Sequence, residues 1–215
     1  MKKVVKILSK CLLLFLLILP ALFIQFASHS DIVIGLTSLI QTHLLLSIFL
    51  LLLLKVFSVI YPPMPGIVFT LATIPILGWK TAYAIDFVGS AIGTTSSYYL
   101  GKKFGSAILK KIVGKSLANK ILAIKLKQKN QIEATVFIRF ASGGVLSDGL
   151  AWGANLIGFQ YVPFITGYSI CHLITTLPVF YFVAASISLD SWVVFAAAMV
   201  IAWLVIFKFK GRYFE

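Results

Sequence analysis

The sequence predicts an all-α polytopic membrane protein with about four spanning helices and two re-entrant hairpins that enter from opposite sides. Of its 215 residues 60% are apolar and only 12% are charged, and the mean hydropathy is +1.02. Ordinary globular domains are about 45–50% apolar and about 25% charged. The apolar residues occur in segments of about 20, the length that crosses a bilayer as a helix, and two of these segments are interrupted by glycine or proline. This composition excludes intrinsic disorder and a soluble nucleic-acid-binding domain.

Residues 1–43 begin with a basic stretch followed by an apolar run from Cys11 to Ala27. This layout fits either a cleaved signal peptide or an uncleaved first span. Because the run is long, we favour the uncleaved span, with the lysines before it held in the cytoplasm.

The first hairpin is expected near residues 60–78. The apolar stretch 44–60 ends in Tyr61-Pro62-Pro63-Met64-Pro65-Gly66, and apolar sequence resumes over 67–79. Prolines cannot continue a helix, since each removes a backbone donor and crowds the preceding turn. A broken apolar segment indicates a re-entrant hairpin, whose backbone must be satisfied by protein or by a water-filled cavity. The alternative is a tight loop between two full spans.

Residues 81–100 form a third apolar segment, which carries Asp86. Gly89, Gly93, Ser97 and Gly101 recur at a spacing of four and therefore share one helical face. Small residues let another backbone approach closely, so this ladder predicts helix packing.

The net charge of +13 comes from 19 basic and 6 acidic residues, and nine of the lysines lie between Lys102 and Lys129. Basic residues beside hydrophobic segments are typical of cytoplasmic loops and contact anionic lipid. Leucines and isoleucines recur between these lysines at roughly helical spacing. We therefore expect residues 102–129 to form a basic amphipathic helix on the anionic cytoplasmic leaflet, with no nucleic-acid partner.

The second hairpin is expected near residues 136–158, where glycines and charges again interrupt apolar sequence. Spans at 161–185 and 192–207 follow, joined by an external turn at 186–191. Counting the crossings places both termini and the lysine segment in the cytoplasm and the hairpins on opposite sides, an arrangement shared with many inverted-repeat transporters. The expected domains are 1–43, 44–185 and 186–215.

A short internal echo agrees with a repeat. Leu77-Gly78-Trp79 closes the first hairpin, and Ile157-Gly158-Phe159 closes the second 80 residues later. Each is followed by a long apolar segment.

Several short motifs also occur in a distinctive order. The proline-rich turn 62–66 is followed by Gly89-x3-Gly93-x4-Tyr98-x2-Gly101-Lys102-x2-Gly105, then by Phe137-x-Arg139-Phe140 and Gly153-x4-Gly158-Phe159. Their order and spacing resemble the DedA or VTT-domain family of integral membrane proteins, also called SNARE-associated Golgi proteins. The resemblance covers about residues 61–184.

The resemblance implies two opposed re-entrant hairpins and a role in moving lipids between leaflets or in membrane homeostasis. Bacterial members are associated with recycling of undecaprenyl phosphate and with stress tolerance that depends on the proton-motive force, and eukaryotic relatives scramble phospholipids. The family's functional residues are acidic groups near the first hairpin and two arginines around the second. Arg139 matches the first arginine. The acids would fall near Ser58 and at Ile67 in this sequence, and no second arginine follows in or near the second hairpin.

An ionisable group in hydrocarbon costs about 2.5–3.5 kcal/mol on insertion scales, so it persists where a partner or cavity receives it. We expect Arg139 to bind a lipid phosphate, whose oxygens match a guanidinium; the alternatives are an ion pair with Asp148 or a snorkelling side chain. Asp86 and Asp148 are candidates for proton or charge coupling. In the alternative, Asp86 simply reaches the interface and Asp148 caps a hairpin. Lys55 is expected to snorkel or to meet a hairpin carbonyl, and His172 to make a structural hydrogen bond.

No nucleophile with a base, paired catalytic carboxylates or nucleotide-binding loop is visible, so we do not expect an enzyme. Cys11 and Cys171 are too few for a metal site or a disulfide framework and are predicted to be small buried hydrophobes; no metal or cofactor is expected.

The sequence therefore predicts a lipid transporter or scramblase for phospholipid or polyprenyl phosphate, placed in a bacterial inner or plasma membrane. Membrane lipids are its expected partners, and a homo-oligomer is compatible with the pattern. Two alternatives remain. One is a non-transporting membrane-biogenesis or assembly factor, and the other is a proton-coupled small-molecule carrier.

Overall fold

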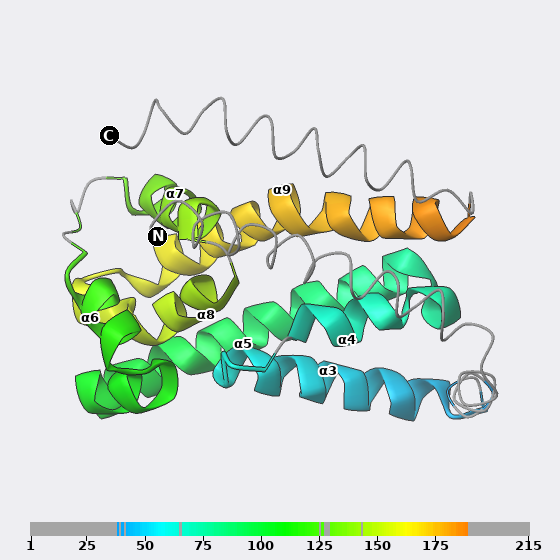
Figure 1. Cartoon of the computed structure of the whole chain (residues 1–215), viewed down its shortest axis with the longest axis horizontal. Coiled ribbons are helices and arrows are strands. Elements are labelled where there is room, and N and C mark those ends of the chain that lie inside the picture. Colours follow the sequence, from blue (N-terminus) through cyan, green and yellow to red (C-terminus); the bar gives the residue numbers. More distant parts are fainter. Residues whose placement is uncertain are drawn as a thin grey trace, which may run out of the picture.

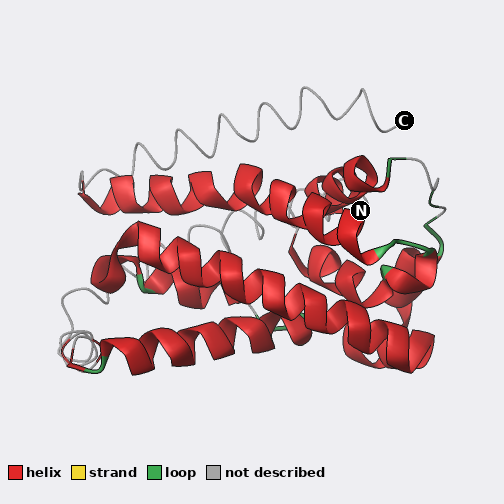
Figure 2. Cartoon of the chain, turned by 180° about the vertical axis from the view of Figure 1, so that it is seen from behind, coloured by secondary structure: helices red, strands yellow, loops and turns green. Residues whose placement is uncertain are grey.

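The structure is a computed structural model that describes residues 38, 40, 42–64, 66–124, 126, 130–142 and 144–188, and it describes side-chain surroundings in these ranges except at 141–147 and 186–188. Within these ranges every regular element is a helix, which confirms the all-α prediction for this part of the chain (Figure 2). The predicted first and last spans, both termini, Cys11 and Pro65 lie outside the described residues.

The helices pack around one long central element. They are α3 (Leu44–Ile60), α4 (Gly66–Ala72), α5 (Ile74–Val113), α6 (Lys115–Leu122), α7 (Gln131–Ser142), α8 (Gly144–Gly153), a 3-10 turn η1 (Asn155–Ile157) and α9 (Tyr161–Ser188). Helix α5 contacts α3, α8 and α9, and α7 packs against α9.

The first hairpin consists of α3 and α4. Helix α3 runs towards the middle of the molecule, and α4 returns to the end at which α5 begins (Figure 1). The break between them contains buried Pro62 and exposed Pro63, as expected from residues that cannot donate a helical hydrogen bond. The Tyr61 carbonyl accepts from the Met64 amide at 3.0 Å, which closes the turn.

The second hairpin consists of α7 and α8, which lie on either side of residue 143. Its open end lies at the opposite end of the molecule from that of the first hairpin, so the two turns point towards each other (Figure 1). A direct bond joins the hairpins, because the Trp152 indole donates to the Ile60 carbonyl at 3.0 Å. That carbonyl is one of those that a helix C-terminus leaves without an intrahelical partner.

A glycine with positive φ follows each hairpin. Gly78, with φ of 74°, separates the end of the first hairpin from the long part of α5, and Gly158, with φ of 94°, follows η1 and precedes α9. Positive φ is readily available to glycine alone. The 80-residue echo in the sequence therefore corresponds to two breaks with positive φ, each before a long helix. Gly105, with φ of 68°, bends α5 a second time.

The buried apolar residues form two separate cores. One surrounds Trp152 where α5, α6, α8 and the start of α9 meet, and the other joins Leu71 and Ala82 to Phe180 near the end of α9. Buried polar residues are also numerous, and on α5 and α9 they lie between the residues of the two cores. We call the whole set the polar band: Lys55, Ser58, Thr70, Thr73, Asp86, Ser90, Thr94, Ser97, Gln131, Thr135, His172 and Thr176.

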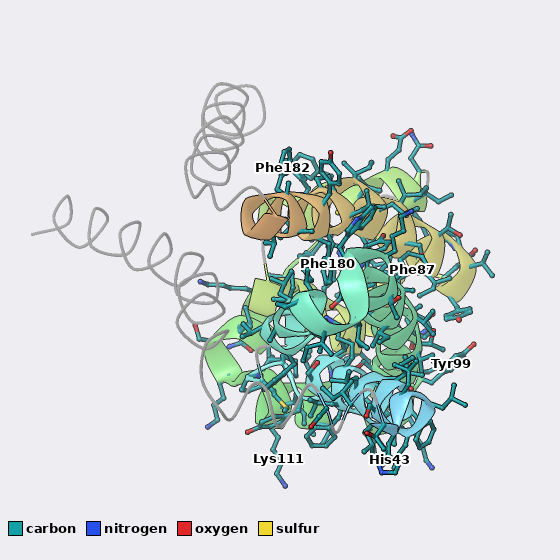
Figure 3. All side chains as sticks on the ribbon, turned by 90° about the vertical axis from the view of Figure 1, so that its right-hand side faces the viewer. His43, Phe87, Tyr99, Lys111, Phe180 and Phe182 are labelled. Atoms are coloured by element: carbon teal, nitrogen blue, oxygen red, sulfur yellow. The ribbon has the colours of Figure 1, made fainter. Side chains whose placement is uncertain are left out.

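Many large apolar side chains lie on the outer surface. Phe182 lies on the outer side of α9 and Phe180 on its inner side (Figure 3). Among the described helices, α9 is long and apolar enough over Tyr161–Ala185 to cross a membrane, whereas α3 is apolar but shorter. The predicted span 81–100 does not meet this criterion, because Asp86 and the glycine, serine and threonine residues of its buried face lower its hydropathy. Large apolar side chains are also exposed along α3: Leu44, Leu45, Leu46, Phe49, Leu50, Leu53 and Phe57.

The lysine-rich segment differs from its prediction. It is no single helix, because Gly105 and Gly114 break it at positive φ, and its apolar side does not face outwards. Leu109 and Ile121 are fully buried in the core around Trp152. The described lysines of this segment are exposed, and Lys111 points away from the ribbon (Figure 3). The periodicity was that of a helix, but the protein itself covers the apolar face.

Close packing at Gly101 gives a testable prediction. A Cβ at Gly101 would collide with the backbone carbonyl of Trp152, which cannot rotate away. We expect Gly101→Ala to lower the free energy of unfolding by about 1–3 kcal/mol, the usual cost of overpacking. Gly149→Ala is the matched control, since its Cβ would meet only side chains, the nearest at 3.1 Å; it should change stability by less than about 1 kcal/mol. Equal stability of the two variants in thermal unfolding would contradict this packing.

Candidate functional site

The small-residue ladder of α5 brings this helix against both hairpins. A Cβ at Gly89 would lie 2.8 Å from the Lys55 Cβ on α3, and one at Gly93 would lie 2.7 Å from the Val59 Cβ. Further along, Gly101 contacts the Trp152 backbone on α8. The glycines thus allow α3 to lie close enough for Lys55 to reach the interior of the molecule.

Two other predicted glycines also sit at close contacts. Gly66 faces the Ser58 side chain at the turn of the first hairpin, and Gly153 faces Ile121 on α6. The Ser58 hydroxyl donates to the Lys55 carbonyl at 2.7 Å. Ser58 stands near the position where the resemblance places an acid, and in this chain it only supports the end of α3.

Asp86 is the centre of the polar band. It is completely buried on α5, and three side chains from three other helices contact its carboxylate. The Lys55 Nζ lies 2.6 Å from Oδ1, the Thr70 hydroxyl donates to the same oxygen at 2.6 Å, and the His172 Nε2 lies 3.0 Å from Oδ2. A buried carboxylate requires such pairing. The alternative that Asp86 reaches an interface is wrong.

Arg139 extends this group into the second hairpin. Its Nη2 lies 3.0 Å from the His172 Nδ1, and its guanidinium carbon lies 3.3 Å from the centre of the Tyr168 ring. A cation over an aromatic face gains electrostatic energy from the ring quadrupole. Tyr168 and His172 are themselves stacked, with centroids 6.2 Å apart. Arg139 is only half-buried, so it joins the buried charges to the more accessible side of α7.

Asp148 lies on α8 beside these groups. It is partly buried, and its electrostatic partners are Arg139, Lys55 and Asp86. We use "central cluster" below for Lys55, Asp86, Arg139, Asp148 and His172. Its members come from both hairpins and from both long helices. The sequence singled out Asp86, Arg139 and Asp148 as charged residues within apolar segments, and the structure brings these three together.

The sequence interpretation missed two members of the cluster. Lys55 neither snorkels nor meets a hairpin carbonyl with its ammonium group, because that group pairs with Asp86. His172 makes the expected hydrogen bond, but with Asp86 and Arg139 as its two neighbours it is the link between the charges. The available signal was the same for both: an ionisable residue inside an otherwise apolar run.

A row of hydroxyls continues from the cluster along α5. Ser90, Thr94 and Ser97 are buried and follow Asp86 at helical spacing. Beyond them, the Tyr98 hydroxyl donates to the Phe159 carbonyl at 2.8 Å and accepts from the Asn155 amide at 3.1 Å. A separate cavity of about 410 Å³ lies at the starts of α7 and α9, between residues such as Gln131 and Gln160. It is lined by other residues than the cluster.

The cluster combines two fixed cations, two carboxylates and one imidazole, which suits the holding of an anion or the movement of a proton more than bond-making chemistry. The described residues hold no group of three histidine, cysteine, aspartate or glutamate side chains that would suit a metal ion. Cys171 is buried and free.

No known protein-family model, curated protein or solved structure matches this chain. The resemblance to the DedA family therefore rests on the motifs of the chain itself.

The Lys55–Asp86 pair gives a second prediction. Asp86→Asn leaves a buried lysine without its anion, and we expect it to lower the free energy of unfolding by about 3–5 kcal/mol. The double variant Asp86→Asn, Lys55→Met should recover much of that loss, since no unpaired buried charge remains. Glu133→Gln, which removes an exposed carboxylate on α7, is the control and should change stability by less than about 0.5 kcal/mol. Additive effects of the two substitutions in chemical unfolding would argue against the pair.

Proposed function

We propose that this protein is an integral membrane protein that moves an amphiphilic anion, a phospholipid or a polyprenyl phosphate, between the two leaflets. The observation that carries the proposal is the central cluster, in which fixed charges from two opposed hairpins meet inside a molecule that exposes many large apolar side chains. The motif order that resembles the DedA family agrees with it.

The distribution of polarity supports a membrane setting. A water-soluble protein rarely exposes large contiguous apolar patches, yet the outer faces of α3, α5, α7 and α9 all expose large apolar side chains. Charged groups within hydrocarbon persist where partners receive them, and Lys55, Asp86 and His172 receive one another.

The arrangement also supports passage of a headgroup. Arg139 is half-buried on the second hairpin and can present a planar set of donors to phosphate oxygens. The buried hydroxyls of Ser90, Thr94 and Ser97 continue the polar surface away from the cluster. In this proposal the headgroup moves along these polar groups while its acyl or prenyl chain remains in the lipid outside the helices.

Reconstitution tests the proposal directly. Liposomes with a leaflet-labelled phospholipid or polyprenyl phosphate should show faster transfer with the protein than without it. Arg139→Gln should slow that transfer at least about tenfold, which corresponds to a loss of roughly 1.4 kcal/mol. Lys111→Gln is the matched control, because Lys111 is an exposed cation far from the cluster, and its rate should stay unchanged. Transfer no faster than in empty liposomes for both lipid classes would overturn the proposal.

The exposed lysines support a second candidate, a non-transporting assembly factor that docks on anionic lipid. Replacing Lys110, Lys111, Lys115 and Lys120 by glutamate should then abolish docking of the protein, held in a neutral nanodisc, to phosphatidylglycerol vesicles. Arg139→Gln should leave docking intact. Lipid transfer that depends on Arg139 and is indifferent to the four lysines would exclude this candidate.

A further inference from the structure

The contact between Arg139 and His172 defines where the imidazole carries its proton. An arginine side chain has donors only and cannot accept a hydrogen bond. The Nη2 of Arg139 lies 3.0 Å from the Nδ1 of His172, so Nδ1 must be the acceptor. The other ring nitrogen, Nε2, lies 3.0 Å from the Asp86 carboxylate, and it carries the ring proton because Nδ1 does not. His172 is therefore neutral, with its proton on Nε2.

This geometry makes a second proton on His172 incompatible with the Arg139 contact. A proton on Nδ1 would place two donors, both charged, against each other at 3.0 Å. The contact to Asp86 would persist and become an ion pair, because the charged ring would lie 3.0 Å from the carboxylate. Protonation would thus keep His172 of α9 in contact with Asp86 of α5. It would release Arg139 of α7 from its contact with α9.

The groups around His172 come from every helix near it. Asp86 and the stacked Tyr83 lie on α5, and the stacked Tyr168 lies on α9 itself. Lys55 on α3 and Arg139 on α7 act on His172 through their charge. Asp148 on α8 interacts with Arg139, Lys55 and Asp86. The two cations oppose a proton on His172, and the Asp86 carboxylate favours one.

We infer that His172 is the proton-binding residue of this protein and that an anionic phosphodiester at Arg139 binds together with one proton on His172 Nδ1. The anion takes over the Arg139 donor that contacts His172 Nδ1 in this structure, and the freed Nδ1 lone pair accepts the proton. The inference rests on the proposed phosphate site at Arg139, and it assigns the coupling to an imidazole and not to Asp86.

The first test is the protonation state of His172 in the wild-type chain. Selective ¹⁵N-histidine labelling distinguishes the two ring nitrogens, and the chain has three histidines, so His172→Gln identifies the relevant signals. In a phosphate-free maltoside detergent at about pH 8 we expect Nε2 protonated and Nδ1 bare. Adding dihexanoyl phosphatidylglycerol at about pH 6 should protonate Nδ1. A neutral His172 with its proton on Nδ1 would overturn the inference.

The second test is the pH dependence of anion binding. Dihexanoyl phosphatidylglycerol and dimethyl phosphate each keep one charge between about pH 5 and pH 8, so any pH dependence belongs to the protein. By linkage, uptake of one proton should strengthen binding by up to about tenfold for each unit of pH decrease while free His172 is neutral. Binding of the lipid alone would indicate a lipid headgroup site, and equal binding of both probes a general phosphodiester site; both outcomes with this slope support the inference.

Substitution of His172 by glutamine provides the decisive comparison. A glutamine amide can accept from Arg139 as neutral His172 does, and it can donate to Asp86, but it cannot take up a proton. We expect His172→Gln to lose the pH slope, and His43→Gln, at an exposed position before α3, to keep it. The same slope in His172→Gln and wild type would overturn the inference and leave the proposed function standing. If neither probe binds at any pH, the anion site of the proposed function is overturned, and the inference with it.

Discussion

The pairing of Asp86 is the interaction on which the rest of the structure depends. Its carboxylate is completely buried, and it reaches Lys55 on α3, Thr70 on α4 and His172 on α9. An unpaired carboxylate at that depth would cost several kcal/mol. The two limbs of the first hairpin and the long helix α9 must therefore converge on α5 at this point, and Arg139 then fixes α7 to α9 through His172. The glycine ladder of α5 is what permits this convergence, since Gly89 leaves room for the stem of Lys55.

Several features of this arrangement could be predicted from the sequence because they depend on local chemistry. Prolines end α3, glycines at a spacing of four produce a close-packed face, and the echo around Gly78 and Gly158 marks two breaks with positive φ. The pairing of charges could not be predicted. Asp86 is 31 residues from Lys55 and 86 from His172 along the chain, and periodicity gives the face of a residue but not the partner across from it.

The same limit explains the lysine-rich segment. Its spacing indicated an amphipathic helix, and the apolar face exists, but Leu109 and Ile121 bury that face in the core around Trp152. A pattern of apolar residues cannot distinguish a lipid surface from the interior of the protein, because both are apolar. The exposed apolar rows on α3 and α9 do not by themselves identify what covers them. They support the membrane proposal only together with the charges that lie behind them.

In the account proposed here, two opposed hairpins bring fixed charges into one buried site, and that site handles an anionic headgroup. An experimental structure in nanodiscs that contain polyprenyl phosphate or phosphatidylglycerol tests this claim most directly. The account predicts density for a phosphate within hydrogen-bonding distance of Arg139, between the two hairpins, with Lys55 and Asp86 still paired behind it. A structure in which the hairpins are separated, or in which Asp86 faces lipid or water without Lys55, would contradict it.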